Sequence, residues 1–566
     1  FYDFERIRAQ LEERGHRFRT KSDSEIVLHL YEDYGPECLH RLRGEYAFVI
    51  WDGRNHRLIA GRDRFGVKPL FYAKHDDALY LASEAKALFA MGVPARWSHD
   101  AVYAGGFIIP GERTLFRGVN AVPPGHYLRA TGESHRLHQY WDVDYPRDDM
   151  APPARSEREY VEGFRAVLEE SVKTRLRADV PVGCYLSGGI DSCAVLGLAS
   201  LHHDGPVRAY TLTFDGPQYD ESVIAEEMAR RAGATYQPIP MRQEDLANHF
   251  RAAVIQSEIP FINGHTVAKF MLSRAVRESG YKVVLTGEGS DEILAGYPHF
   301  RRDMLLHHTV GQDPDETERL LAKLVEDNQV SRGLLLPEGD SDTGDVCRTL
   351  LGYVPSWLEA MTGTGARMRG LMRDDFLEPH RRTDVIATLL SSLDVRGRLQ
   401  GRNAVHGALY LWAKTALPHY ILSNLGDRME MAHSVEGRVP FMDHNVAEYL
   451  HQVPVSMKIR GMTEKYILRE AVKDVITDTV YERQKHPFLS PPATLHPEEP
   501  LHALMQDTLR GSAAADGPFL DQKKLVAALD GLRDPDADFG HQVITDQVLT
   551  LALSFVFMQE GLGITA

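Results

Sequence analysis

One segment of the chain combines a short apolar run, a glycine pair and two serines. The apolar residues 182–186 lead directly into Ser187-Gly188-Gly189-Ile190-Asp191-Ser192. At a strand-to-helix turn, adjacent glycines let backbone N–H groups converge on an anion, because no side chain blocks the approach. Ser187 and Ser192 can donate to phosphate oxygens, and Asp191 can hold Mg²⁺ through a hard carboxylate. The hexapeptide within a β–α unit therefore predicts a phosphate-binding loop, in preference to an ordinary turn capped by Ser192.

The loop lacks the lysine that precedes the Ser or Thr of a Walker-type loop. Its spacing resembles instead that of the ATP pyrophosphatases, which cleave ATP between the α and β phosphates and release pyrophosphate. This resemblance implies that a substrate is activated as an adenylate, and that no phosphoryl group is transferred.

Two further segments fit the same chemistry. An apolar run at 283–285 continues into Thr286-Gly287-Glu288-Gly289-Ser290-Asp291-Glu292, which carries three carboxylates. Ligands of open α/β sheets bind outside the carboxyl ends of the strands, so the two loops are expected to face each other. Lys465 begins an amphipathic helical pattern, where a lysine opposes the helix dipole. Alone, the acids could form a solvated turn and the lysine could lie at the surface; together with the first loop they predict a catalytic site.

The order of apolar patterns divides the chain into an antiparallel part and a parallel part. Before residue 140, apolar runs are separated by turn residues such as Asp52-Gly53-Arg54-Asn55 and His75-Asp76-Asp77, which predicts successive hairpins. A Pro- and Arg-rich stretch at 145–156 is typical of a linker. Beyond it, strands alternate with helices, which predicts a doubly wound parallel sheet. The expected strands are 182–186, 207–214, 235–239 and 282–286, the expected helices are 157–176, 192–203 and 220–232, and a mostly helical region begins near 301.

Composition narrows the class of protein. A chain of 566 residues is too long for one core, so two or three domains are expected. The formal net charge of −16 argues against a nucleic-acid partner, and no run of about 18 apolar residues predicts a membrane span. Cys38, Cys184, Cys193 and Cys347 stand at unrelated spacings that fit neither a disulfide framework nor a zinc ligand set, so a cytoplasmic location is expected.

Together the three segments resemble the glutamine-hydrolysing asparagine synthetase family. The resemblance covers nearly the whole chain and includes Tyr219-Asp220-Glu221 and the segment 431–443. It implies an α/β protein of two domains. Residues 1–145 would form a class II glutamine amidotransferase domain, antiparallel and β-rich with an Ntn-type αββα arrangement. Residues 155–566 would form a doubly wound, parallel-sheet ATP-pyrophosphatase domain with helical additions.

In this family the amidotransferase domain hydrolyses glutamine. The matching stretches here are 22–25 and 61–70, and the resemblance implies that Asp23 helps to bind the α-amino group of glutamine. The family's nucleophile is an N-terminal cysteine activated by its own α-amino group. The chain starts at Phe1 and lacks that cysteine, whereas the remaining signatures are intact. We therefore expect that a leading segment, about a third of this domain, is omitted from the sequence.

The resemblance implies a reaction in two steps. A carboxylate attacks the α-phosphate of Mg–ATP to give an acyl-adenylate and pyrophosphate, and ammonia from glutamine then attacks the acyl carbon. Lys465 would stabilise the charge that grows on the phosphates, and Glu288 would support adenylate formation or accept a proton from the incoming amine. The residues implied to hold ATP and pyrophosphate are Leu186, Ser187, Gly188, Gly189, Asp191, Ser192, Thr213, Thr286, Gly287 and Asp291, with Asp191 and Asp291 as Mg²⁺ ligands.

The substrate acid is the least constrained part of the reaction. L-aspartate is the family default, and one branch binds its carboxylate with the arginine of a Thr-Thr-x-Arg-Ala-Ser segment. The corresponding residues 260–266 contain no arginine, and the helical region 301–425 is longer than a minimal synthetase needs. Both observations fit a different biosynthetic acid, as in natural-product amidation, or an amide ligase or cyclase of β-lactam synthetase type without glutaminase activity. A non-enzymatic scaffold is disfavoured because the loops are intact. The expected partners are then a small-molecule acid and glutamine. If the protein is not a monomer, the expected assembly is a homodimer.

Overall fold

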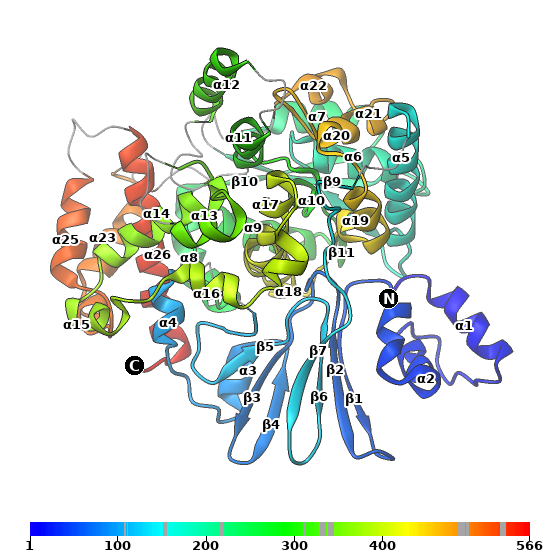
Figure 1. The fold of residues 1–566 in the computed structure, drawn as a ribbon, viewed down its shortest axis with the longest axis horizontal. Coiled ribbons are helices and arrows are strands. Elements are labelled where there is room, and N and C mark those ends of the chain that lie inside the picture. The colour runs from blue at the N-terminus through cyan, green and yellow to red at the C-terminus, as the bar shows by residue number, and fades with distance from the viewer. Residues whose placement is uncertain are drawn as a thin grey trace.

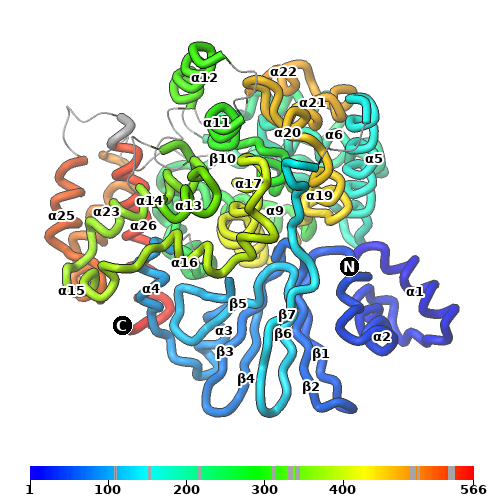
Figure 2. Tube along the Cα trace, viewed as in Figure 1, coloured from blue at the N-terminus to red at the C-terminus, as the bar shows by residue number. Residues whose placement is uncertain are grey.

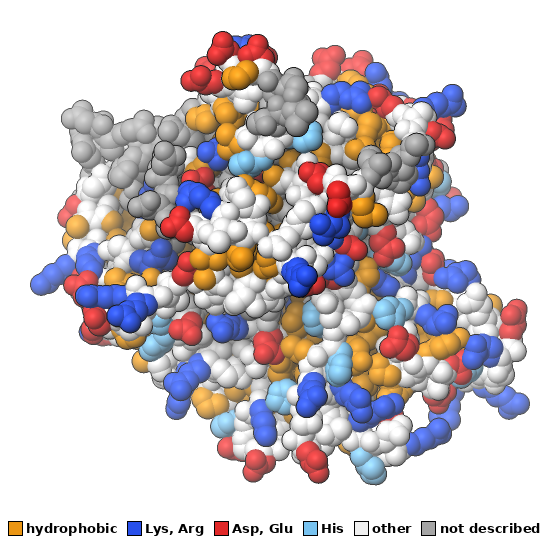
Figure 3. All heavy atoms as spheres, viewed as in Figure 1, with side chains coloured by type: hydrophobic (Ala, Val, Ile, Leu, Met, Phe, Trp, Pro, Cys, Tyr) orange, Lys and Arg blue, Asp and Glu red, His pale blue; other side chains and the backbone are white. Residues whose placement is uncertain are grey.

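The computed structural model describes residues 1–106, 109, 111–150, 155–214, 220–308, 313–328, 335–337, 344–484, 493, 497–532 and 539–566. A strand-rich N-terminal domain lies against a larger C-terminal domain in which helices surround a sheet (Figure 1). The chain trace passes once from the first domain to the second (Figure 2). On the face in Figure 3, acidic and basic side chains are interspersed.

The N-terminal domain contains two antiparallel sheets, a 4-stranded one ordered β1-β2-β6-β7 and a 3-stranded one ordered β4-β3-β5. Asp76 and Asp77 join β3 to β4 with positive φ of 44° and 59°, as a two-residue hairpin turn requires. The hairpins expected from the sequence are confirmed. The strands are β1 (Ala47–Asp52), β2 (Arg57–Arg62), β3 (Phe71–His75), β4 (Ala78–Ala82), β5 (Val119–Ala121), β6 (His126–Ala130) and β7 (His135–Gln139).

The two sheets face each other across a small apolar core and carry helices on their outer sides. Ala60 and Leu128 of the first sheet meet Tyr72 of the second in this core. Helices α1 (Phe4–Glu13) and α2 (Glu25–Tyr34) pack outside the 4-stranded sheet. Helices α3 (Ala85–Ala90) and α4 (His99–Tyr103) pack outside the other. This order of layers confirms the expected αββα arrangement.

The C-terminal domain is built on a 5-stranded sheet ordered β10-β9-β8-β11-β12, in which every pair is parallel. Successive side chains enter cores on opposite faces: Cys184 packs in one, Tyr185 in the other. Both faces are therefore covered, as expected for a doubly wound sheet. The strands are β8 (Val182–Tyr185), β9 (Arg208–Phe214), β10 (Thr235–Met241), β11 (Val283–Leu285) and β12 (Glu436–Arg438).

Helices cover the sheet and extend the domain. Those near the sheet are α5 (Glu157–Arg175), α6 (Ile190–Ser200), α7 (Ser222–Arg231), α8 (Gln243–Ser257), α9 (His265–Glu278) and α10 (Ser290–Leu294). The others are α11 (Pro298–His307), α12 (Pro314–Asp327), α13 (Asp345–Leu351), α14 (Ser356–Gly370), α15 (Asp374–Leu377), α16 (Val385–Ser391), α17 (Ala404–Lys414), α18 (Arg428–Met431), α19 (His444–His451), α20 (Val455–Lys458), α21 (Tyr466–Val472), α22 (Asp478–Glu482), α23 (Pro500–Arg510), α24 (Ser512–Ala515), α25 (Gln522–Gly531) and α26 (Phe539–Leu562). The expectation of a mostly helical region after 301 is confirmed.

Helix α26 is the one described helix that is long and apolar enough to cross a membrane. An 18-residue window within Gln542–Leu562 has a mean hydropathy of 1.2, and 83% of this window is buried inside the protein. Buried polar side chains such as Gln547 and Ser554 lie along it, and the Ser554 hydroxyl accepts a hydrogen bond from the Phe261 N–H. These contacts are those of a core helix.

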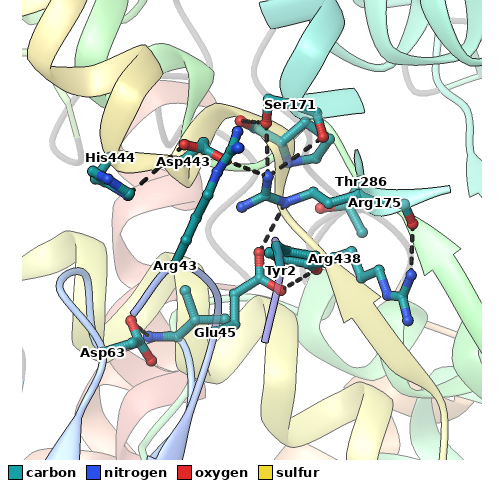
Figure 4. A network of polar contacts seen from close by, with 12 residues as sticks. Tyr2, Arg43, Glu45, Asp63, Ser171, Arg175, Thr286, Arg438, Asp443 and His444 are labelled. Carbon is teal, nitrogen blue, oxygen red and sulfur yellow. Dashed lines mark hydrogen bonds and ion pairs between the residues drawn. The ribbon is translucent and has the colours of Figure 1, made fainter. Parts of the chain in front are cut away.

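A buried polar network joins the two domains (Figure 4). Arg43 of the N-terminal domain donates a 2.8 Å hydrogen bond to Asp443, which precedes α19. Arg175 at the end of α5 donates to the same carboxylate oxygen at 2.7 Å and to Glu45 at 3.0 Å. Tyr2 closes the network by donating to Glu45 at 2.7 Å. Charged side chains from both domains therefore neutralise one another where the domains meet.

Candidate active site between strands β8 and β11

The two loops singled out in the sequence meet at the centre of the parallel sheet. From β8 the chain continues to β9 and β10 on one side, whereas β11 and β12 lie on the other. Such a reversal opens a crevice at the carboxyl ends of the central strands. A Cβ atom on Gly287 would lie 2.7 Å from the Ser192 nitrogen and 2.9 Å from the Asp191 Cβ. Glycine at 287 is therefore what lets the second loop touch the first.

The first loop folds around its own serines and presents a backbone N–H to an anion. The Ser187 and Ser192 hydroxyls lie 3.0 Å apart, and the Gly189 N–H donates to the Ser187 Oγ at 3.1 Å. The Gly188 N–H donates to the Glu221 carboxylate at 3.0 Å. A carboxylate oxygen thus accepts the hydrogen bond that the sequence predicts for a phosphate oxygen. The loop therefore offers an N–H donor to an anion, as the prediction requires.

A guanidinium that the sequence analysis did not identify covers this loop. Arg483, just after α22, forms a 2.7 Å ion pair with Glu221. A Cβ on Gly188 would collide with its Nη1 atom, which is buried and has no hydrogen-bond partner within the described ranges. No motif around 483 identifies this cation, because only the fold brings it to the loop. Tyr219, which belongs with Glu221 to the segment that resembles the family, lies outside the described residues.

Asp191, Asp291 and Lys465 converge from three separate elements. The fully buried Lys465 Nζ lies 2.6 Å from both carboxylate oxygens of Asp191 and 2.6 Å from Asp291. The Ser290 hydroxyl also donates to Asp191 at 2.6 Å. Lys465 precedes α21 with φ of 52°, so its conformation is left-handed. Two carboxylates that share one cation are also a hard-oxygen donor set that fits Mg²⁺.

The other two carboxylates of the second loop bind partners other than Lys465. Glu292 is buried and accepts a 2.7 Å hydrogen bond from the Tyr297 hydroxyl. Burial and the nearby charge of Asp291 raise the pKa of Glu292 to about 7, although the Tyr297 hydrogen bond opposes the rise. The three acids that looked equivalent in the sequence therefore have three different partners, and Asp291 alone joins Asp191 on Lys465.

Glu288 pairs with a second cation that the sequence analysis missed. Lys269 on α9 donates a 2.6 Å hydrogen bond to Glu288 Oε1, and its Nζ lies 4.2 Å from the centre of the Tyr185 ring. Glu288 Oε2 is buried and has no hydrogen-bond partner among the described residues. The segment 260–266 contains no arginine, whereas the buried cation stands one helical turn later. A helical pattern after 264 could have suggested Lys269 as a candidate. The neighbouring sequence, however, contains no signal that its side chain reaches Glu288.

Glu430 is buried near enough to Glu288 to feel its charge, and its pKa leads to a prediction of how stability depends on pH. Burial and the charge of Glu288 raise the pKa of Glu430 from 4.5 to about 8. Between these values the folded protein holds a proton that the unfolded chain has lost, so stability falls as the pH rises from about 4.5 to about 8. Glu430→Gln should therefore melt at a higher temperature than the wild type near pH 8 and at the same temperature near pH 4, below the unfolded pKa. Melting curves of Glu278→Gln, at the exposed end of α9, serve as the control. Parallel pH profiles for Glu430→Gln and wild type would contradict the assignment.

The remaining predicted residues divide between the two domains. Leu186 and Thr286 are buried beside the two loops, and the Thr286 N–H donates to the Arg438 carbonyl at 3.0 Å. Thr213 lines a cavity of about 440 Å³ at the ends of β9 and β10. Asp23 lies in the N-terminal domain, in the connection between α1 and α2. The structure thus gathers the predicted synthetase residues at one sheet edge and places Asp23 apart from them.

Comparisons with known proteins agree with this arrangement. The asparagine synthase family profile matches residues 163–556, and the glutamine amidotransferase domain profile matches residues 1–141. "Amidase chry2" of Gibberella zeae is 36% identical over 94% of this chain and 81% of the relative. "Amidase chyE" of Penicillium rubens is 38% identical over 88% and 77%. "Asparagine synthetase [glutamine-hydrolyzing] 3" of Bacillus subtilis is 28% identical over 88% and 75%. With a family match over most of its length, the chain belongs to the asparagine synthase family of glutamine amidotransferases.

Proposed function

We propose that this chain forms an amide from a biosynthetic acid other than L-aspartate, using ATP and glutamine. The acid is activated as an acyl-adenylate with release of pyrophosphate, and ammonia from glutamine then replaces the adenylate. Glutamine hydrolysis is assigned to residues 1–145 and amide synthesis to residues 155–566. The observation that carries the proposal is the convergence of Asp191, Asp291 and Lys465 beside the glycine loop.

The geometry supports a division of work among the residues that would hold ATP. Asp191 and Asp291 would hold Mg²⁺, which supplies positive charge to the leaving pyrophosphate when bound. Lys465, released from one or both carboxylates, would donate to the phosphates. The Gly188 N–H would exchange its Glu221 partner for a phosphate oxygen, and Arg483 would follow because it is paired with Glu221. The Gly188 N–H and the buried Lys465 ammonium already stand at the loop before ATP binds, and donors held in place favour charge that develops in the transition state.

The substrate side of the site supports an acid other than L-aspartate. A bidentate carboxylate site is poorly replaced by Asn263 and Gly264, which stand where one family branch has its arginine. Lys269 is buried and committed to Glu288 at 2.6 Å. Two relatives with 36% and 38% identity are named amidases, whereas the asparagine synthetase reported above is 28% identical. The free Oε2 of Glu288 would accept the proton from the attacking ammonia.

Pyrophosphate release tests this proposal. The full-length protein is incubated with ATP, Mg²⁺, glutamine and a panel of carboxylic acids that begins with L-aspartate. We expect one biosynthetic acid to stimulate release well above L-aspartate, and chelation of Mg²⁺ to abolish it. Asp191→Ala should lose the release, and Asp204→Ala, at an exposed turn after α6, should keep it. Full release by Asp191→Ala would refute the site, whereas a preference for L-aspartate would refute only the substrate class.

A further inference from the structure

A group of two histidines and one glutamate lies in the N-terminal domain, away from the proposed catalytic residues. His16 follows α1, and His29 and Glu32 stand three residues apart on α2, so both face the same side of the helix. The side chains of His16 and His29 are 14% and 15% exposed, whereas that of Glu32 is 56% exposed. The two imidazoles are therefore largely buried, whereas Glu32 reaches solvent.

The ligand atoms of these three side chains form a nearly equilateral triangle. The two Nδ1 atoms are 3.1 Å apart, and the Glu32 Oε2 lies 3.3 Å from His29 Nδ1 and 3.5 Å from His16 Nδ1. Zinc bonds of about 2.0–2.2 Å in a tetrahedral site place neighbouring ligand atoms about 3.3–3.6 Å apart. We propose that His16, His29 and Glu32 form a zinc site whose fourth position is open to solvent.

Outer carboxylates orient both imidazoles for this role. His16 Nε2 lies 3.0 Å from Asp33, and His29 Nε2 lies 3.6 Å from Glu25. The Asp33 contact favours the His16 tautomer with a proton on Nε2, which leaves its Nδ1 free to bind a metal, and the negative charge of Glu25 favours the same tautomer of His29 from a longer distance. Without a metal, the 3.1 Å contact requires one Nδ1 to carry a proton toward the other. In a neutral pair the donor ring would turn an unprotonated Nε2 toward its own outer carboxylate, whereas a metal at the two Nδ1 atoms lets both rings keep the Nε2 proton.

Charge and ligand type select the class of cation. Glu25, Glu32 and Asp33 surround the two imidazoles, and Arg14 offsets part of this charge through its 2.9 Å contact with Asp33. Two imidazoles and one carboxylate suit Zn²⁺ better than Mg²⁺ or Ca²⁺, which prefer oxygen ligands alone. The Phe18 ring lies 4.4 Å from the His29 ring and shields one side.

The site would fasten the loop that carries Asp23. Glu25, the outer partner of His29, also accepts hydrogen bonds of 2.7 Å from the N–H groups of Arg19 and Thr20. Arg8 of α1 donates to the Thr20 carbonyl from the other side. A metal between His16 and α2 therefore closes both ends of this loop. Its role is structural, because it holds the connection between α1 and α2 in which Asp23 lies.

Metal binding to the full-length protein tests this inference without any activity assay. Zn²⁺ is titrated by calorimetry into the metal-free wild type and three variants. We expect one tight site per chain, an affinity loss of about 10- to 100-fold for Asp33→Asn, and a larger loss for His16→Ala. His40→Ala should bind like the wild type, since His40 has a carboxylate neighbour 3.4 Å away, Glu37, but belongs to no metal-ligand group among the described residues.

Cobalt spectroscopy of the wild type keeps the inference testable if a variant fails to fold. Co²⁺ in this site should give the intense visible absorption of a tetrahedral ion, and Zn²⁺ should displace it. Equal Zn²⁺ affinity for wild type and His16→Ala, or a weak octahedral Co²⁺ spectrum in the wild type, would overturn the assignment. In that case the two imidazoles share a proton. Neither result depends on pyrophosphate release, so this site and the proposed function can fail separately.

Discussion

Replacing Lys465 with methionine is expected to reduce pyrophosphate release by about 100- to 1000-fold, the usual cost of removing one preorganised donor from a transition state. The Lys465 ammonium contacts both Asp191 and Asp291. Methionine keeps the apolar stem and removes the charge, so packing around α21 is largely preserved. The measurement is the rate of pyrophosphate release at saturating ATP and acid.

Two controls separate the catalytic loss from a folding defect. Lys473→Met changes an exposed lysine just after the same helix and should keep wild-type release. In Lys465→Met, Asp191 and Asp291 lose their shared cation, so Mg²⁺ should raise the melting temperature of this variant more than that of the wild type. Release within a few-fold of wild type would show that Lys465 serves only to neutralise the two aspartates.

Local sequence patterns were enough to predict the central β–α unit. The strand predicted at 182–186 and the helix at 192–203 correspond to β8 (Val182–Tyr185) and α6 (Ile190–Ser200). The helix begins two residues earlier than predicted, so Asp191 and Ser192 lie inside its first turn. The hexapeptide was informative because a residue with a side chain at Gly188 would collide with Arg483. The glycine in this short segment therefore indicates a tertiary contact.

Local sequence patterns could not predict residues whose positions depend on contacts with distant parts of the chain. Lys269 reaches Glu288 from α9, and the sequence patterns predicted no helix between 239 and 282. Arg483 reaches Gly188 across almost three hundred positions, with no local pattern to mark it. Strand β12 spans only Glu436–Arg438, too short for any periodic signal, although it completes the sheet. Topology, and not propensity, determines these placements.

The histidine group illustrates the same difference. Within α2, the spacing of His29 and Glu32 is visible in the sequence, and it places them on one face of a helix. His16 stands thirteen positions before His29, in a loop with no regular pattern. The spacing of the four cysteines was the one sequence pattern compared with a zinc ligand set, and it does not contain this combination. A loop ligand can be recognised only once the fold has placed it.

Arg175→Met is expected to lower the free energy of unfolding by about 3–5 kcal/mol, the usual cost of removing one partner from a buried ion pair. Arg175 is 1% exposed and contacts Asp443 at 2.7 Å and Glu45 at 3.0 Å. Without it, Glu45 loses its guanidinium partner and Asp443 retains Arg43 alone. The loss should appear in denaturant unfolding curves at neutral pH. Arg177→Met, two residues later and exposed, is the matched control and should change stability little.

Acid titration distinguishes this network from simple loss of packing. Burial alone would raise the pKa of Asp443, but the charges of Arg175 and Arg43 outweigh it and hold that pKa well below the ordinary range. The folded state therefore binds the Asp443 proton more weakly than the unfolded chain does. Its contribution to stability is present above the unfolded pKa and is lost as the pH falls. Arg175→Met should lose less stability than the wild type on acidification, because part of that contribution is already gone. Equal losses would mean that Arg175 acts through packing, and that Arg43 alone neutralises Asp443 where the two domains meet.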